Sequence, residues 1–318
     1  MRDDTPSRTA AWVAAARQLG GLLPDDVRLV DDPYGAAFTS RWIASLIEQA
    51  IAEEDDGSGA PLDMALRRLR GPLAAMPGLR RWILYMQVRT RVIDDLIREF
   101  VEGGGAQVVL LGAGFDCRAL RMPELAGLRV LEIDHPATQG HKRGTLARIG
   151  AISPATYVPW NFEERPMEDL PEALAEAGHD PARPTFTVWE GVTMYLLEPT
   201  IDASLRAIAA WSAPGDSLLA MTYFAKGRLA RPSLVTRAIR GVLATWGEPW
   251  RFGWEPDELP GYLAERGLEL ADDIPISDAA RLLLPPDLAA HVHDPDRRVA
   301  LATSSETIAI ARRADRRP

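Results

Sequence analysis

The chain has a single cysteine, Cys117, and only five histidines among its 318 residues. One thiol cannot form an internal disulfide, and the scattered histidines lack the spacing of a zinc site. No apolar stretch is long enough to cross a bilayer. Residues 1–21 carry charged side chains around an alanine-rich stretch, which suits an amphipathic helix better than a signal peptide. These features predict a cytoplasmic protein that needs no metal.

Positive charge is also scarce. The 36 Lys and Arg residues are outnumbered by 45 Asp and Glu residues, which gives a net charge of -9. Such a surface repels nucleic acid phosphates and anionic membranes. The basic tail, 311–318, has four arginines, but so short a terminal run is typical of a solvated chain end. We therefore expect neither nucleic acid nor a membrane as a partner, and the sequence does not specify an oligomeric state.

The pattern of apolar residues divides the chain into a helical part and a part in which strands and helices alternate. Residues 1–105 have helical periodicity, which is strongest over 81–101 and stops at three consecutive glycines. Short apolar runs then alternate with segments of helical periodicity, as in a buried parallel sheet covered by helices on both faces. The middle of the chain is therefore predicted to be a doubly wound α/β sheet. The expected strands are 107–111, 128–133, 156–160, 185–189, 217–222, 268–274 and 306–311.

Residues 224–260 break this rhythm with prolines and aromatic side chains. We interpret them as an inserted lid in a single domain, 1–318, with a helical part, 1–105, and a core formed by 106–223 and 261–318. The aromatic lid would suit a flat or apolar acceptor, although core packing explains such residues equally well. A tyrosine in the helical part could form the opposite wall or only a structural turn. The candidate acceptor-pocket residues are Tyr34, Trp246, Trp250, Phe252 and Trp254.

A small-residue turn, Gly112, Ala113 and Gly114, follows the first predicted strand and precedes a helix. Missing side chains allow the backbone to approach a bound nucleoside. The dinucleotide fingerprint requires a third glycine where this chain has Cys117. The turn therefore favours a nucleoside cofactor without a pyrophosphate.

Polar residues follow the next two predicted strands. Asp134 ends the second strand about twenty residues after the glycine turn, where α/β folds bind a ribose through its hydroxyls. Glu132 is on the same face and is a second candidate, and both could instead be surface carboxylates. Asn161 and Phe162 follow the third strand, where they could contact an adenine or form only a polar turn.

Arg89 lies within the apolar stripe of the helix predicted over 81–101, and a charge there needs an anion. That anion could be the carboxylate of an amino acid cofactor or a structural ion-pair partner. Glu190 and Gly191 end the fourth strand, where Glu190 could accept from a ligand ammonium group. Tyr195 lies one helical turn further, near the reacting centre or in the packing. The other charges of the helix, Arg91, Asp94, Asp95 and Arg98, are expected to form surface pairs.

Taken in order, five segments resemble the leucine carboxyl methyltransferase family, especially its actinobacterial branch that includes tetracenomycin-type polyketide carboxyl methyltransferases. The resemblance spans nearly the whole chain. The segments are Asp31-Asp32-Pro33-Tyr34-Gly35, Arg89-Thr90-Arg91-Val92-Ile93-Asp94, Leu111-Gly112-Ala113-Gly114-Phe115-Asp116-Cys117-Arg118, Glu132-Ile133-Asp134-His135-Pro136 and Trp189-Glu190-Gly191-Val192-Thr193-Met194-Tyr195-Leu196.

The resemblance implies a class I methyltransferase fold, Rossmann-like with a doubly wound seven-stranded sheet, an N-terminal helical extension and an inserted lid. It implies S-adenosylmethionine as the cofactor, with no metal. Arg89 and Glu190 would hold its methionyl part above the glycine turn, and Asp134 would bind the ribose. Asn161 departs from the family's more common aspartate. Arg8 and Thr9 resemble a segment that closes over the methionyl carboxylate.

The expected activity is methyl transfer to an oxygen of a small molecule, with a carboxylate as the acceptor. A carboxylate is already ionised at neutral pH, and neither His135 nor His141 is in the position of a general base. A phenol acceptor that uses an aspartate or a water chain remains an alternative. An NAD-dependent oxidoreductase would need a third glycine and a Tyr-x-x-x-Lys pair, and a non-catalytic relative would lose Arg89 or Glu190.

Overall fold

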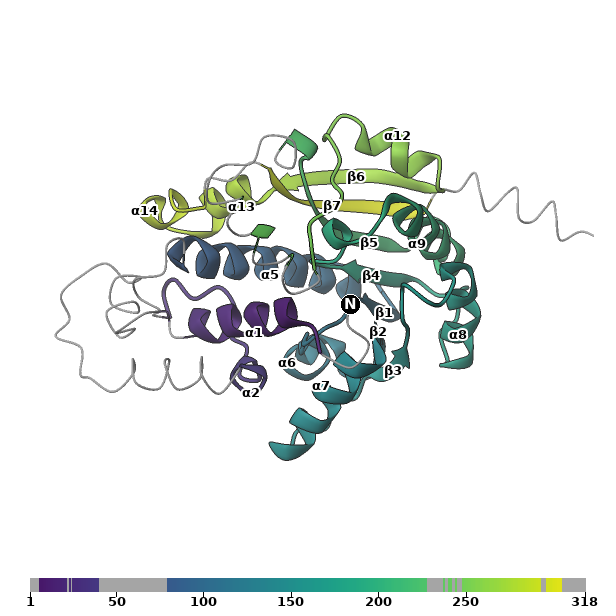
Figure 1. The fold of residues 1–318 in the computed structure, drawn as a ribbon, viewed down its shortest axis with the longest axis horizontal. Helices are drawn as coiled ribbons and strands as arrows, with labels where there is room; N and C mark the ends of the chain where they lie inside the picture. The colour runs from purple at the N-terminus through teal and green to yellow at the C-terminus, as the bar shows by residue number, and fades with distance from the viewer. Residues whose placement is uncertain are drawn as a thin grey trace, which may run out of the picture.

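In the computed structural model, the described residues are 6–39 except 22 and 24, then 79–227, four single positions between 237 and 244, 248–292 and 296–304. Their centre is a seven-stranded sheet with the strand order β3-β2-β1-β4-β5-β7-β6 (Figure 1). The strands are β1 (Gln107–Leu111), β2 (Arg129–Asp134), β3 (Thr156–Pro159), β4 (Thr185–Trp189), β5 (Leu218–Phe224), β6 (Leu268–Pro275) and β7 (Arg297–Ser304).

The first five strands are parallel, whereas β7 runs antiparallel to both β5 and β6. The chain passes from β1 outward to β3 and then returns to β4 on the other side of β1, which creates a topological switch between β1 and β4. Open α/β sheets bind ligands at such a switch, outside the carboxyl ends of the strands. The topology alone therefore marks the edge where a site is expected.

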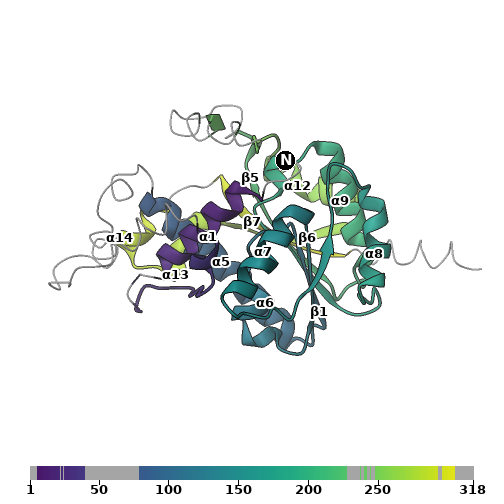
Figure 2. The ribbon, with the colours of Figure 1, turned by 60° about the horizontal axis from the view of Figure 1, so that its bottom comes forward.

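Helices cover both faces of the sheet (Figure 2). Val108 and Leu110 of β1 pack into the core that includes α1, α5 and α13, whereas Val109 and Leu111 pack into the core that includes α8, α9 and α12. Every residue of β1 is buried, which explains why its sequence is almost wholly apolar instead of alternating. The α-helices are α1 (Arg8–Gly20), α2 (Gly35–Phe38), α5 (Leu79–Glu102), α6 (Arg118–Arg121), α7 (Pro136–Arg148), α8 (Leu170–Glu176), α9 (Glu198–Trp211), α12 (Leu259–Ala264), α13 (Ile276–Leu283) and α14 (Pro286–Ala289).

Two long N-terminal helices pack together against the sheet. Helix α1 begins at Ser7, whose Oγ accepts a hydrogen bond from the backbone N–H of Ala10 at 3.1 Å. Helix α5 buries its apolar stripe and ends before the predicted glycines, where Gly104 has a φ of 93°. None of the helices in the described ranges combines the length and apolarity required to cross a membrane.

The predicted doubly wound sheet and six of its strands are present, but the seventh strand was predicted in the wrong place. It lies at Arg297–Ser304, and the predicted range 306–311 falls outside the described residues. The error has a physical reason, because β7 pairs on both edges while residues such as Arg298 and Thr303 remain only partly buried. Its apolar run, 299–302, is only four residues long and lies between two arginines and the pair Thr303 and Ser304.

The predicted lid range, 224–260, overlaps regular structure at both ends. Phe224 is the last residue of β5, and α12 begins at Leu259. Just beyond β5, Ala225 forms an isolated parallel bridge with Trp254, which ties the returning chain to the end of that strand. Most of the residues between them lie outside the described ranges.

Candidate active site

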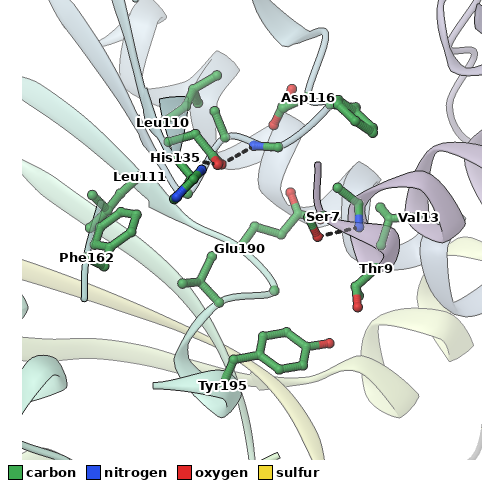
Figure 3. Close-up of a pocket in the computed structure, with 18 of the residues that line it drawn as sticks. Ser7, Thr9, Val13, Leu110, Leu111, Asp116, His135, Phe162, Glu190 and Tyr195 are labelled. Atoms are coloured by element: carbon green, nitrogen blue, oxygen red, sulfur yellow. Dashed lines mark hydrogen bonds between the residues drawn. The ribbon is translucent and has the colours of Figure 1, made fainter. Parts of the chain in front are cut away.

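A pocket opens at the carboxyl ends of β1, β2 and β4, at the topological switch (Figure 3). Its walls come from the first turns of α1, the turn after β1, the end of β2, the residues after β3, the 3₁₀-helix η4 (Thr193–Tyr195) and the chain at 248–251. Phe162 lies on one side of the pocket, whereas Thr9 and Val13 of α1 lie on the other (Figure 3). Segments distant in sequence therefore converge on one cavity.

The predicted glycine turn forms the floor of the pocket. The N–H groups of Gly112 and Ala113 donate to the carbonyl oxygen of Ile133 at 2.8 and 3.0 Å, which fastens the turn to β2. Gly112 has a φ of 70°, and a Cβ there would lie 2.4 Å from Cγ2 of Val192. Only glycine satisfies both the backbone conformation and this close approach.

Asp134 lines the pocket at the end of β2, as predicted. One carboxylate oxygen accepts from the N–H of Gly114 at 2.6 Å, and the other accepts from the N–H of His135 at 2.7 Å. Burial raises the pKa of this carboxyl, and the two backbone donors act against the rise. Each oxygen has a further lone pair, so the group is able to accept from ligand hydroxyls.

Arg89 and Glu190 both line the pocket and contact each other. Nε of Arg89 lies 2.6 Å from Oε1 of Glu190, and the two side chains are 5% and 8% exposed. Nη1 of Arg118 lies 2.6 Å from the other oxygen, Oε2. Burial alone would raise the pKa of Glu190, yet Arg118 and Arg89 lower it to about 2. The two functions considered for Arg89, a structural ion pair and a pocket cation, therefore occur together.

Arg118 was not predicted as a site residue, although it lies beneath the site. Its Nε is 2.7 Å from Oδ1 of Asp94, it also pairs with Asp116, and its side chain is fully buried. Arg121 binds the second oxygen of Asp94 at 2.6 Å. The prediction that Asp94 forms an exposed pair was wrong, because helix α6 covers that side of α5 and its Arg118 and Arg121 both bind the Asp94 carboxylate.

Glu132 takes a different place from the one predicted. It is 1% exposed, its Oε2 lies 2.5 Å from Nζ of Lys142, and it does not line the pocket. It shares a face with Asp134 but lies one side-chain repeat further from the strand end, where α7 covers the sheet. The Glu132–Lys142 pair therefore fastens α7 to β2.

The residues after β3 and β4 were placed correctly at the pocket. Asn161 and Phe162 both line it, and Oδ1 of Asn161 also accepts from the N–H of Glu163 at 3.1 Å in a polar turn. Gly191 has a φ of 72° and donates its N–H to Oγ1 of Thr222 at 2.7 Å. Without a side chain at Gly191, the guanidinium of Arg89 stays accessible from the cavity.

The first turn of α1 reaches across to the chain at 248. The backbone N–H of Thr9 donates to Oε2 of Glu248 at 3.1 Å, and its hydroxyl donates to the same oxygen. Arg8 is exposed and lies outside the lining. Tyr195 lies below Glu190, with its hydroxyl directed toward α1 (Figure 3). Burial raises the pKa of this phenol, while the neighbouring Trp250 and Thr9 side chains act against the rise.

The predicted acceptor-pocket aromatics that the structure describes lie outside the lining. Trp254 is 2% exposed and packs edge to face on Tyr223, with ring centroids 5.7 Å apart, because the bridge to Ala225 turns this segment into the core. Trp250 packs on Phe224 at 4.8 Å and supports Tyr195 from behind. The other residues of that prediction are Phe252, which packs on Trp254 in the core, Tyr34, which packs against the cluster of Phe38 and Phe115, and Trp246, which lies outside the described residues.

The charges of the pocket fit the expected cofactor. S-adenosylmethionine has a positively charged sulfonium and an ammonium group beside one carboxylate, and the described lining offers five carboxylates and three arginines. Its ammonium and carboxylate match Glu190 and Arg89, and its ribose matches Asp134. In the described part of the chain, no cluster of His, Cys, Asp and Glu forms a metal site.

Comparisons with known proteins identify the family of the chain. The model of the leucine carboxyl methyltransferase family matches residues 10–209. A relative from Streptomyces coelicolor, named "Putative S-adenosyl-L-methionine-dependent methyltransferase", is 37% identical over 265 residues, which cover 82% of each chain. One from Frankia alni with the same type of name is 35% identical over 211 residues, 63% of this chain and 73% of that protein.

A solved structure shares the fold. The crystal structure of a DUF574 family protein from Streptomyces avermitilis superimposes with a TM-score of 0.53 at 18% identity, covering 82% of this chain and 97% of that chain. The seven-stranded sheet is that of class I methyltransferases, and the range matched by the family model includes the glycine turn and Glu190. The chain belongs to the leucine carboxyl methyltransferase family and is an S-adenosylmethionine-dependent methyltransferase.

Proposed function

We propose that the enzyme methylates a carboxylate oxygen of a small organic acid, with an aromatic or polyketide-derived acid of secondary metabolism as the acceptor class. The observation that supports a carboxylate is the state of the bases in the pocket. A phenol or alcohol must lose a proton to become a good nucleophile, whereas a carboxylate is already ionised at neutral pH. The choice of acceptor therefore depends on whether a base is available.

Five of the candidate bases inside the described pocket are already engaged, including Glu248 at the acceptor end, which accepts two hydrogen bonds from Thr9. Asp116 and Glu190 pair with buried arginines, and Asp134 accepts from two backbone N–H groups. His135 uses Nδ1 to accept from the N–H of Ala137 at 3.2 Å, which caps α7. A base with such partners would lose their interactions when it took a proton, so an acceptor that needs no base fits better.

The side chains divide into a cofactor end and an acceptor end. Arg89 and Glu190 hold the methionyl part of S-adenosylmethionine, Asp134 holds the ribose, and Asn161 and Phe162 contact the adenine. When bound, S-adenosylmethionine supplies a methyl group whose bond to sulfur breaks as the acceptor oxygen takes it, leaving S-adenosylhomocysteine. The protein contributes alignment of the acceptor and exclusion of water.

The acceptor end is formed by Tyr195 and the chain at 248–251. Because its pKa is raised, Tyr195 stays neutral at pH 7 and is able to donate a hydrogen bond to an acceptor oxygen without acting as a base. We propose that the segment between β5 and α12 acts as the lid over this end, and that the reaction takes place in the cytoplasm with no nucleic acid partner.

Paired acceptors test the choice of carboxylate. The enzyme is incubated with methyl-labelled S-adenosylmethionine and either 2-naphthoic acid and anthraquinone-2-carboxylic acid or the matching phenols, and products are identified by mass spectrometry. We expect methyl esters, which mild alkali hydrolyses, and a rate that does not follow phenol ionisation. Alkali-stable methyl ethers from the phenols, with no ester from the acids, would refute the carboxylate proposal while leaving methyl transfer intact.

A further inference from the structure

Arg251 lines the acceptor end of the pocket and is fixed there through its backbone. Its N–H donates to the carbonyl oxygen of Met194 at 2.6 Å, beside Tyr195. The preceding residue, Trp250, is anchored against Phe224 with ring centroids 4.8 Å apart. An exposed arginine is therefore attached to a rigid part of the wall and not to a freely moving loop.

The pairing of Arg251 differs from that of the other arginines in the pocket. Nε of Arg17 lies 3.1 Å from Oδ2 of Asp32, and Arg89 pairs with Glu190. Among the described residues, none forms an ion pair or side-chain hydrogen bond with Arg251. Its guanidinium is thus the cation in the described lining whose charge is not already balanced by a neighbouring carboxylate.

An anionic acceptor needs such a cation here. The lining has five carboxylates against three arginines, so an acid entering the pocket meets a surplus of negative charge. Arg89 is committed to Glu190 at the cofactor end, and Tyr195 offers one neutral donor. A guanidinium provides several donors in a planar fork that matches a carboxylate.

We propose that Arg251 binds the carboxylate of the acceptor and selects acids over neutral analogues. This inference rests on the proposed function, because it assigns a residue to the carboxylate that the enzyme would methylate. Arg251 acts as a specificity residue: it neutralises the acid on entry and holds one carboxylate oxygen, while the other oxygen remains free as the nucleophile. Cofactor binding at Arg89 and Glu190 does not depend on it.

Binding measured by calorimetry tests this selection. The enzyme, saturated with S-adenosylhomocysteine, is titrated with 2-naphthoate and with 2-naphthamide. We expect the wild type to prefer the acid, and Arg251→Gln to weaken naphthoate at least tenfold, about 1.4 kcal/mol, while naphthamide and S-adenosylhomocysteine change less than twofold. Arg251→Lys keeps the charge but not the fork, so we expect an intermediate loss. The matched control is Arg281→Gln, an exposed arginine on α13 that does not line this pocket.

The outcomes separate this inference from the function on which it rests. If the wild type forms methyl esters and prefers naphthoate, but Arg251→Gln retains that preference, the assignment of Arg251 is wrong and the carboxylate proposal stands. If the wild type binds the amide as tightly as the acid and methylates the phenols, both fail. An equal loss of acid, amide and S-adenosylhomocysteine binding in Arg251→Gln would indicate a collapsed pocket wall and would also overturn the assignment.

Discussion

The guanidinium of Arg89 forms an ion pair with Glu190 and also lines the cofactor end of the pocket. We predict that Arg89→Ala weakens S-adenosylhomocysteine binding at least tenfold, about 1.4 kcal/mol or more. The change removes a donor for the amino acid carboxylate and leaves Glu190 with one fewer arginine. Isothermal titration calorimetry measures the effect, with NAD as a ligand expected not to bind.

Arg91 provides the matched control on the same helix. Its side chain is partly exposed and pairs with Asp95 four residues later, outside the pocket. Arg91→Ala removes the same charge two positions away, so we expect less than a twofold change in affinity. If both alanine variants bind S-adenosylhomocysteine as tightly as the wild type, Arg89 is not the anchor of the cofactor.

The buried carboxylates also predict how stability depends on pH. The pKa of Glu190 is lowered from 4.5 to about 2, and that of Asp116 is lowered in the same direction, despite burial, mainly by Arg118. A depressed pKa contributes stability that is present above the unfolded value and is lost as pH falls toward the folded one. The free energy of unfolding should therefore decrease as pH falls from about 4.5 toward 2.

Glu190→Gln tests this dependence. The variant removes one of the two groups, so its urea-unfolding free energy should fall less steeply between pH 5 and pH 3, by at most about 1.4 kcal/mol per pH unit. It should also be less stable at pH 7, because Arg89 and Arg118 lose a partner. Glu258→Gln, at an exposed carboxylate, serves as the control. If the unfolding free energies of the wild type and Glu190→Gln fell equally steeply with pH, the lowered pKa of Glu190 would not be a cause of the acid sensitivity.

Sequence patterns predicted the charged residues that line the pocket better than the buried ion pairs beneath the pocket. Arg89 could be singled out because a charge interrupts an apolar stripe, and Asp134 because it ends a strand after a glycine turn. Asp94 gave no such signal, since periodicity cannot distinguish a helix face that meets water from one that meets another charged segment. Only the fold shows that Arg118 and Arg121 reach it.

At the scale of elements, the turn after β1 depends on a backbone shape that side chains disfavour. We predict that Gly112→Ala lowers both stability and S-adenosylhomocysteine affinity, because φ is 70° and the new Cβ would meet Cγ2 of Val192 at 2.4 Å. Thermal unfolding and calorimetry measure the two effects. Gly140→Ala is the matched control, because it lies within α7 with open space around it, so the change should be neutral or stabilising.

A second substitution separates the two causes. Val192→Ala removes the clashing methyl, so the pair Gly112→Ala with Val192→Ala should recover part of the lost stability. The remainder reflects the left-handed backbone, on the order of 1–2 kcal/mol. A double variant no more stable than Gly112→Ala alone would show that the contact with Val192 is not the source.

The central parallel strands β1 and β4 were predictable because all their residues are buried and their sequences are largely apolar. At the antiparallel edge, β6 was predicted in its place, whereas β7 was not, because its apolar stretch is short and part of the strand is only partly buried. The end of the predicted lid was misread for a related reason. An aromatic-rich segment looks the same in sequence whether its rings cover a cavity or, like Trp254, enter the core.

Across the whole molecule, the pocket is completed by segments from opposite parts of the chain. Helix α1 contributes Thr9, and the proposed lid segment contributes Glu248, which accepts two hydrogen bonds from Thr9. The sequence spacing of 239 residues gives no indication that these two meet. This contact joins the N-terminal helical part to the chain at 248–251 in the wall of the pocket.

We predict that Thr9→Val speeds the release of S-adenosylhomocysteine and weakens its affinity by about three- to tenfold, because the hydroxyl that donates to Glu248 is lost while the side-chain shape is kept. Stopped-flow displacement gives the dissociation rate, and calorimetry gives the affinity. The neighbouring Arg8→Ala is the control, since Arg8 is exposed and lies outside the pocket lining, and we expect it to change neither quantity. An unchanged release rate in Thr9→Val would mean that this contact does not restrain the cofactor. An equal effect of Arg8→Ala would instead assign the closure to the helix end as a whole.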